Sequence, residues 1–434
     1  MSSTVGDKSC QTAEGQRLQA AHDAIRHSPR PPKESPSASL LLGTRISASN
    51  VERRWNLLPD QQESHALLLD PQTQEQMPAY QGNIENFIGT VKIPVGLAGP
   101  LRVHGAHACG DYYIPLATTE AALVASYDRG ARLISAAGGC TALLLEEGVG
   151  RAPGFAFRSL TDSALFVDWV RNQIENLRHA AAGTTQHGRL LDIAARVEGN
   201  HVYLHLQFST GDAAGQNMVT IATAAVCRYI TEHCPVQPHY VLIDANLGHD
   251  KKATTHSFLR VRGRGVTAEA IIPEALLVRW LHTTPQDLAK GVQMALAGGV
   301  MSGTVGFSGQ FANGLAALFL ACGQDVACVT ESAVGMSRCE ITPEGDLYAT
   351  VTLPNLIVGT VGGGTRLPSQ NACLQIMGLA GEGKAHALAE VCAAVCLAGD
   401  LSMMAALCSG HFVRAHKVLS RTRARSQAQS QSGE

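Results

Sequence analysis

The segment RLLDIAARVEGNHVYLHLQF, residues 189–208, carries the pattern that decides the fold of its part of the chain. From Val202 to Phe208 every second residue is apolar, which is typical of a strand with one buried face. The turn-forming residues Glu198-Gly199-Asn200 precede this strand, and residues 189–197 supply a second arm. The segment therefore predicts a β-hairpin.

Two further elements are expected on each side of the hairpin, a strand and a helix before it and a helix and a strand after it. They cover residues 155–158, 162–177, 212–233 and 240–243. Thr161 or Asp162 is the expected N-cap of the first helix, because apolar residues recur at helical spacing behind it. The resulting order, βαββαβ, is the ferredoxin-like pattern, and it is predicted to be inserted within a larger domain.

The remainder of the chain predicts an α+β fold. After residue 244, strand-like runs alternate with long apolar helices. The expected strands are residues 257–261 and 348–353, and the expected helices are residues 313–322 and 385–398. With 434 residues, of which 45% are hydrophobic, the chain is long enough to bury a large core and to form two or three domains.

Charge and cysteine usage exclude several classes of partner. The 34 basic and 36 acidic residues nearly cancel, so neither nucleic acid nor a membrane surface is indicated, and a small-molecule substrate is expected. The 12 cysteines include no C-x-x-C pair and favour reduced thiols in a cytoplasmic protein. The N-terminus lacks the apolar segment of a signal peptide, and Glu390 and Asp400 interrupt the most apolar late stretch, so no membrane span is predicted.

Five charged residues lie in otherwise apolar sequence and are the first candidates for catalysis: Glu120, Lys251, Lys252, Asp325 and His416. A lysine beside carboxylates can stabilise an oxyanion, a glutamic acid with a raised pKa can donate a proton, and a histidine can protonate a leaving thiolate. Each of these residues, taken singly, is more often structural.

Two glycine-rich segments are candidates for nucleotide binding. The helix expected after Gly211 opens with GDAAGQNM, where small residues let a ligand approach free N–H groups. The run Val361-Gly362-Gly363-Gly364-Thr365 also permits close approach of a ligand to the backbone. Neither segment has the G-x-G-x-x-G spacing, so an ordinary helix start and a flexible turn remain the alternatives.

Other reactive side chains are interpreted as structural. Cys140 has no histidine or basic group near it in the sequence, which favours a core cysteine over a nucleophile. The pairs His249 with His256 and His201 with His205 lack a third ligand at a recognisable spacing, so no metal site is predicted.

Several of these residues lie in motifs that resemble the hydroxymethylglutaryl-CoA (HMG-CoA) reductase family. In order, between about residues 51 and 421, the motifs are ENFIG, IPVGLAGP, ATTEAALVAS, DKKA, ACGQD, TVGGGT and GHFVRAH. They resemble class I, in a soluble bacterial-type form, more than the second bacterial class, whose members tend to use NADH. The resemblance implies NADPH-dependent reduction of HMG-CoA to mevalonate and CoA, in isoprenoid biosynthesis.

The resemblance implies four catalytic residues, Glu120, Lys251, Asp325 and His416. Lys251 would stabilise the oxyanion formed from the thioester, and His416 would protonate the departing CoA thiolate. Glu120 would donate a proton in the second reduction, with Asp325 coupled electrostatically to Glu120 and Lys251.

Binding residues follow from the same motifs. The hydroxymethylglutaryl part would be bound by Arg151, Asn246, Asp250, Lys252 and Asn313, and CoA by Ser126 and Arg129. The cofactor would be bound by Asp212, Gly215, Gln216, Asn217, Gly363 and Gly364. NADPH is favoured over NADH, and no metal is expected. Active sites of this family form between subunits, which implies a homodimer or homotetramer.

The sequence pattern and the resemblance together predict the domain organisation. A disordered segment is expected at each end of the chain. A large domain for HMG and CoA binding surrounds an inserted ferredoxin-like NADP-binding domain, and a helical segment with the catalytic histidine follows. In chain order the boundaries are 1–44 (disordered), 45–152 with 244–400 (large domain), 153–243 (insert), 401–421 (helical segment) and 422–434 (disordered tail).

Three positions depart from the animal members of the family. Asp244 stands in place of a serine, and Ser308 and Gln310 stand near an asparagine and a histidine. These departures keep open a catalytically silent binding paralogue. The reverse, catabolic oxidation of mevalonate to HMG-CoA with NAD is a second alternative.

Overall fold

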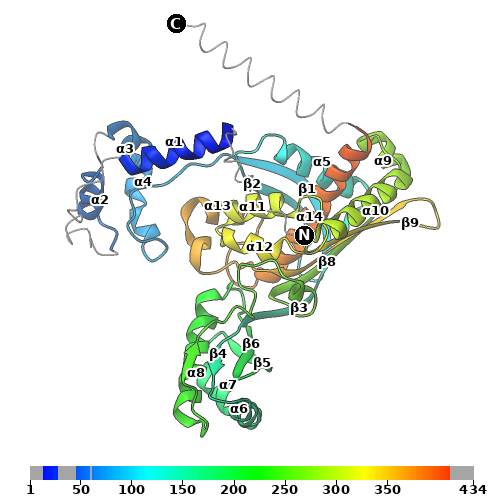
Figure 1. The fold of residues 1–434 in the computed structure, drawn as a ribbon. Helices are drawn as coiled ribbons and strands as arrows, with labels where there is room; N and C mark the ends of the chain where they lie inside the picture. The colour runs from blue at the N-terminus through cyan, green and yellow to red at the C-terminus, as the bar shows by residue number, and fades with distance from the viewer. Residues whose placement is uncertain (1–12, 28–44, 59–60, 411–434) are drawn as a thin grey trace, which may run out of the picture.

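The computed structural model describes residues 13–27, 45–58 and 61–410. It consists of a wide body and a narrower lobe that projects from it (Figure 1). The body and the lobe have separate hydrophobic cores. Strand β3 (Cys140–Arg151) links them, because it pairs with β8 (Gly263–Ile272) in the body and with the lobe at its last three residues.

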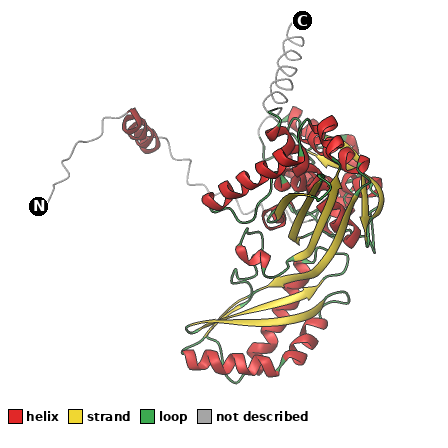
Figure 2. Ribbon diagram, turned by 90° about the vertical axis from the view of Figure 1, so that its right-hand side faces the viewer, coloured by secondary structure: helices red, strands yellow, loops and turns green. Residues whose placement is uncertain are grey.

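The lobe has the ferredoxin-like topology predicted from the sequence. Its sheet has the order β7-β4-β6-β5 and is antiparallel throughout. The strands are β4 (Gly154–Ala156), β5 (Arg189–Glu198), β6 (His201–Ser209) and β7 (Tyr240–Leu242). The helices are α6 (Leu160–Asn172), α7 (Ile174–Ala182) and α8 (Gln216–His233), and helices cover one face of the sheet (Figure 2).

The hairpin of β5 and β6 confirms the prediction made from alternation. The four apolar side chains of β6 between Val202 and Phe208 are at most 1% exposed. The expected N-cap was wrong, because Ser159 caps α6 by accepting from the backbone N–H of Asp162. The expected single helix is divided at Gln173 into α6 and α7.

Helix α8 begins four residues later than expected. Residues 211–215 form a turn instead, in which the Thr210 hydroxyl donates to the Ala213 carbonyl oxygen. Gly215 has a φ of 78°, a left-handed conformation that favours glycine, and is the N-cap of α8. The glycines that suggested a helix start therefore form the turn that precedes it.

The sheet of the body is mixed. Strands β1 and β3 pair in parallel, and the other pairs are antiparallel, in the order β3-β8-β10-β9 with β2 beside β1. The additional strands are β1 (Val95–Gly105), β2 (Cys109–Ala117), β9 (Met336–Ile341) and β10 (Leu347–Leu356). Residues 257–261, predicted as a strand, are instead the end of a 3-10 helix, η3 (Thr255–Phe258), and the turn after it. Sheet pairing with β3 and β10 begins only at Gly263 and Arg264.

One long helix, α14 (Ala385–Cys408), lies at the centre of the body (Figure 1). By length and composition it could cross a membrane, but 83% of its most apolar window is buried inside the protein. It packs against β3, β8 and α5 (Leu123–Ala136), and therefore serves as the core helix of this fold. It extends the helix predicted at residues 385–398 by ten residues.

Shorter helices surround this core. In the body they are α9 (Glu274–Leu281), α10 (Pro285–Ser302), α11 (Phe311–Cys322), α12 (Val329–Ser332) and α13 (Pro368–Ile376). Near the N-terminus they are α1 (Ala13–His27), α2 (Ala48–Trp55), α3 (Gln62–Leu68) and α4 (Pro71–Glu75). Helix α1 lies within the segment expected to be disordered; it contains alanine, glutamine and leucine and no proline, which favours a helix.

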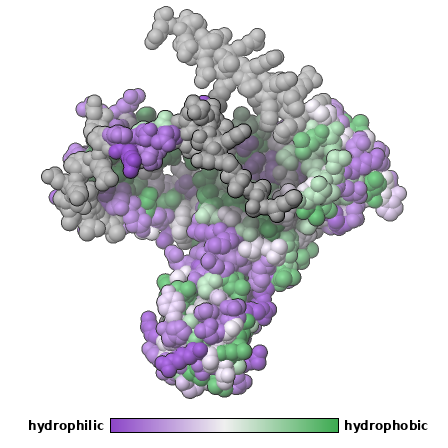
Figure 3. All heavy atoms as spheres, in the orientation of Figure 1, coloured by the Kyte–Doolittle hydropathy of each residue, from purple (hydrophilic) through white to green (hydrophobic). Residues whose placement is uncertain are grey.

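Polar and apolar side chains mix over the lobe, whereas apolar side chains gather on the flank of the body where α9 and α10 lie (Figure 3). Three residues of α10 are largely exposed: Met294 by 80%, Val300 by 73% and Met301 by 87%. A contiguous apolar surface of this kind is typical of a protein contact.

Candidate functional site

The loop between β7 and η3 has an unusual backbone. Asn246, His249 and Lys251 have φ values of 67°, 46° and 53°, although none of them is glycine. Non-glycine residues in the left-handed region are strained, and such strain clusters at functional sites. Two carboxylates hold the loop: Asp244 accepts from the N–H of Asn246 at 2.9 Å, and Glu331 accepts from the N–H of Lys251 at 3.2 Å.

The Lys251 side chain leaves this loop and pairs with Asp325. The distance from Nζ of Lys251 to Oδ2 of Asp325 is 2.8 Å, and both side chains are partly exposed. The other oxygen of Asp325 accepts from the N–H of Ala327 at the start of the next 3-10 turn. The hydrogen bond to Asp325 raises the pKa of Lys251, so the lysine stays protonated and can donate to a developing oxyanion.

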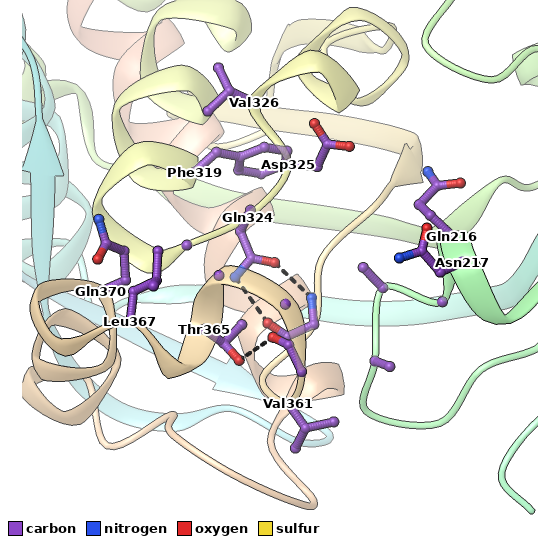
Figure 4. Close-up of a pocket in the computed structure, with 18 of the residues that line it drawn as sticks. Gln216, Asn217, Phe319, Gln324, Asp325, Val326, Val361, Thr365, Leu367 and Gln370 are labelled. Atoms are coloured by element: carbon purple, nitrogen blue, oxygen red, sulfur yellow. Dashed lines mark hydrogen bonds between the residues drawn. The ribbon is translucent and has the colours of Figure 1, made fainter. Parts of the chain in front are cut away.

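A cavity of about 570 Å³ opens beside Asp325 (Figure 4). The turn and first residues of α8, the end of α11 and the glycine-rich segment after β10 line it. Among the lining residues are Gly215, Gln216, Asn217, Asp325, Gly363 and Gly364. Gln216 and Asn217 lie across the cavity from Gln324 (Figure 4). The N-terminus of α8 thus presents free N–H groups and a positive dipole end to the cavity, which suits a phosphate-bearing ligand.

The wall of this cavity depends on backbone contact between glycines. A Cβ atom on Gly364 would lie 2.5 Å from the carbonyl oxygen of Gly323. On the same wall, the side-chain amide of Gln324 donates to the carbonyl oxygen of Gly359 and accepts from the N–H of Gly359. The segment VGGGT is therefore packed closely at Gly364, whereas Gly362 and Gly363 have open space beside their backbone.

Two buried arginines join the strained loop to the cavity. Arg151 donates from one nitrogen to Asp244 at 2.7 Å and to Asp250 at 2.8 Å. Arg262, which is fully buried, donates to Asp250, to Gln216 and to the Gly150 carbonyl oxygen. Although burial opposes ionisation of Asp250, Arg262 and Arg151 hold its pKa below the ordinary value. Asp250 therefore stays charged and ties the loop to both arginines.

The family was identified by comparison of the whole chain with known proteins. Residues 50–421 match the family model of hydroxymethylglutaryl-coenzyme A reductase. The chain belongs to the HMG-CoA reductase family.

Archaeal relatives support the assignment. The 3-hydroxy-3-methylglutaryl-coenzyme A reductase of Aeropyrum pernix is 46% identical over 79% of this chain and 82% of its own length. The corresponding protein of Pyrococcus abyssi is 44% identical over 78% of this chain and 85% of its own length.

A solved structure has the same fold. It is the class II 3-hydroxy-3-methylglutaryl-CoA reductase from Streptococcus pneumoniae bound to NADPH, with a TM-score of 0.62. The two sequences are 21% identical, and the match covers 83% of this chain and 97% of that one.

Of the four catalytic residues expected for an HMG-CoA reductase, the structure brings together Lys251 and Asp325. Glu120 lies in the exposed turn between β2 and α5, where its N–H donates to the Thr118 hydroxyl. Within the described residues, no hydrogen bond or ion pair joins Glu120 to Lys251 or Asp325. His416 lies outside the described residues.

The expected substrate residues divide between two places. Asn246 and Asp250 lie in the strained loop with Lys252, whose ammonium donates to the Asp250 carbonyl oxygen, and Arg151 contacts this loop. Asn313 is exposed on the first turn of α11. The residues expected to bind CoA lie elsewhere: Ser126 and Arg129 on α5 both contact Ser402 of α14.

One expected cofactor residue, Asp212, has a structural contact. The carboxylate of Asp212 accepts from the N–H groups of Gly383 and Ala385 at 2.7 and 3.1 Å, and so satisfies the first turn of α14. It is not among the residues that line the cavity. Cys140 is buried, and burial raises its pKa to about 12, as expected for a core thiol.

Arg262 and Glu331 are the residues of this site that reasoning from the sequence missed. Both are 0% exposed. The signal for Arg262 was an arginine next to a long strand of apolar and small residues, and the signal for Glu331 was an acid four residues before a glycine turn. Neither pattern identifies a partner, because most of the partners lie 46 to 112 residues away along the chain, and even Asp250 lies 12 residues before Arg262.

His249 of the strained loop packs with two further histidines, His205 and His256. Their burial predicts that the stability of the protein depends on pH. The ring centroids of His205 and His249 lie 5.7 and 5.0 Å from the ring centroid of His256. Burial lowers the pKa of His205 to about 4 and that of His249 to about 3. Below about pH 6.5, the ordinary pKa of histidine, each of these side chains binds a proton when the protein unfolds. The free energy of unfolding is therefore highest above that pH and falls as the pH drops toward the lowered pKa of the folded state.

We expect His205→Gln to weaken this dependence. Both ring nitrogens of His205 lack a hydrogen-bond partner within the described residues, so the change removes mainly a titrating group. Between about pH 7 and pH 5 the wild type should lose about 2 kcal/mol more unfolding free energy than the variant. Urea unfolding at both pH values measures the difference, and the exposed neighbour His201→Gln is the matched control. Equal losses in wild type and His205→Gln would contradict the buried neutral state.

Proposed function

We propose that the protein reduces (S)-HMG-CoA to mevalonate and CoA with two molecules of NADPH, as a cytoplasmic enzyme of isoprenoid biosynthesis. The observation that carries the proposal is the protonated Lys251, paired with Asp325 at the rim of a cavity that suits a dinucleotide. A positive group beside a hydride donor is what reduction of a thioester carbonyl requires, because negative charge develops on the carbonyl oxygen.

Bound NADPH would supply the hydride of each step. Lys251 would donate to the carbonyl oxygen in both reductions, and Asp325 keeps that ammonium charged and oriented. His416 would give a proton to the departing CoA thiolate, and Glu120 would give one to the alkoxide of the second step. We expect the active site to be completed by a second subunit, because no hydrogen bond or ion pair within the described residues of one chain joins Glu120 to Lys251.

The binding roles are proposed from the positions of the residues in the family's motifs and in the cavity wall. Arg151, Asn246, Asp250, Lys252 and Asn313 would hold the hydroxymethylglutaryl part, and Ser126 and Arg129 would contact CoA. Gly215, Gln216, Asn217, Gly363 and Gly364 line the cavity and would bind NADPH. Asp212, whose carboxylate also fixes the start of α14, would bind NADPH with them.

The domains and the assembly follow from the same proposal. Residues 153–243 would form the NADP-binding domain, residues 45–152 and 244–400 the domain for HMG and CoA, and residues 401–421 the segment with the catalytic histidine. A homodimer or homotetramer would bury the exposed apolar residues of α10.

The test is oxidation of NADPH by the full chain with HMG-CoA, followed by absorbance, and the same assay with NADH. We expect oxidation with NADPH and identification of mevalonate as the product. Activity only with NADH would support the catabolic reaction instead. No activity with either cofactor would support a silent paralogue, for which Asp244, Ser308 and Gln310 are the altered positions.

A further inference from the structure

Glu331 is a buried carboxylate whose contacts point to the catalytic lysine. It lies on the short helix α12 and is 0% exposed. One of its oxygens accepts from the backbone N–H of Lys251 at 3.2 Å and from Nε of Arg262 at 3.4 Å. The other oxygen has no partner among the described residues. Burying a carboxylate is costly, so its retention here calls for a role in what it contacts.

Arg262, the partner of Glu331, also contacts β3, the start of α8 and the strained loop. Its guanidinium donates to the Gly150 carbonyl oxygen at 2.6 Å, where β3 enters the lobe. It donates to the Gln216 side chain at 2.8 Å, at the N-terminus of α8 in the cavity wall. It also pairs with Asp250, which precedes Lys251. A planar guanidinium can hold three acceptors in a fixed arrangement, which a lysine cannot do.

We propose that Glu331 and Arg262 are positioning residues, which hold Lys251 in its left-handed conformation with the ammonium on Asp325 and fix Gln216 beside it. This inference rests on the proposed function of Lys251. Among the residues that the structure describes, the Glu331 oxygen is the one acceptor for the N–H of Lys251, so the strained φ of 53° depends on it. A neutral amide in place of the carboxylate accepts more weakly from Lys251 and from Arg262, so the loop relaxes and the ammonium moves away from the reacting carbonyl, where small displacements cost large factors in rate.

The kinetic test compares Glu331→Gln with Glu390→Gln. Glu390 is the matched control, because it is also 0% exposed and accepts from three backbone N–H groups, those of His107, Ala108 and Leu144, away from Lys251. We expect Glu331→Gln to lower kcat by about 30-fold, with KM for both substrates changed less than about threefold. Glu390→Gln should change neither constant comparably, even where both variants lose stability.

A double variant decides whether Glu331 acts through Lys251. In a Lys251→Ala background, Glu331→Gln should lower the residual kcat by less than about twofold, because the group that it positions is gone. An equal fall in both backgrounds would overturn the proposal, as would an unchanged kcat in Glu331→Gln.

A third readout does not depend on turnover, and so separates this inference from the proposed reaction. Trace acetylation followed by peptide mass spectrometry compares the reactivity of Lys251 with that of the exposed Lys290. Release of Lys251 from Asp325 increases its free-amine fraction, so its relative reactivity should rise several-fold in Glu331→Gln and in Arg262→Lys, but not in Glu390→Gln. Unchanged labelling in both positioning variants would overturn the inference even if HMG-CoA is the substrate. Increased labelling in a chain inactive on HMG-CoA would sustain the positioning and reject the reaction.

Discussion

Replacing Lys251 by alanine is expected to lower kcat for NADPH oxidation with HMG-CoA by about 10³-fold. The ammonium is the one cationic side chain that contacts Asp325 within the described part of the chain, and Asp325 keeps it charged by raising its pKa. In the proposed mechanism its removal leaves the developing oxyanion without its donor, whereas the proposed cofactor contacts on α8 are untouched. KM for NADPH should therefore change little, while kcat and kcat/KM fall together.

The matched control is Lys290→Ala, which removes an exposed lysine of α10. It should retain activity within about twofold, as expected for a surface substitution. Steady-state kinetics with both substrates varied, and near-native unfolding of each variant, complete the comparison. Retention of more than a tenth of the wild-type kcat in Lys251→Ala would show that another group stabilises the oxyanion.

The sequence predicted the lobe well, because apolar residues recur at every second position in its strands and at helical spacing in its helices. Alternation at Val202, Leu204, Leu206 and Phe208 identified β6, and the spacing of turn formers identified the hairpin. The errors lie where a single residue decides a boundary, as at Ser159 and Gly215. These caps depend on one hydrogen bond or one dihedral angle, which hydrophobic periodicity does not report.

The candidate site was predictable only in part, because its geometry is tertiary. Lys251 and Asp325 stand out as charges in apolar sequence, and the structure pairs them although 74 positions separate them. The contacts of Arg262 join β3, α8 and the strained loop. No local rule places an arginine at such a junction, since its partners meet only after the sheet has formed.

Asp400 on α14 carries the second large prediction, and it concerns stability. The side chain is 4% exposed and accepts from the N–H groups of Gly309 and Gln310, both at 2.8 Å, and from the Ser337 hydroxyl. Asp400→Ala leaves the buried N–H of Gln310 and the part-buried N–H of Gly309 without their acceptor, and each such buried group costs about 1–3 kcal/mol. We expect a loss of about 3–5 kcal/mol in unfolding free energy, measured by urea unfolding.

The same contact links stability to the site, because Gly309 and Gln310 precede α11, which carries Asn313 and ends near Asp325. Asp400→Asn keeps one acceptor oxygen and should lose less than Asp400→Ala. Glu344→Ala, at an exposed turn, is the control and should change stability by less than about 0.5 kcal/mol. If Asp400→Ala were as stable as this control, water would have to reach Gly309 and Gln310, and the start of α11 would not depend on the core helix.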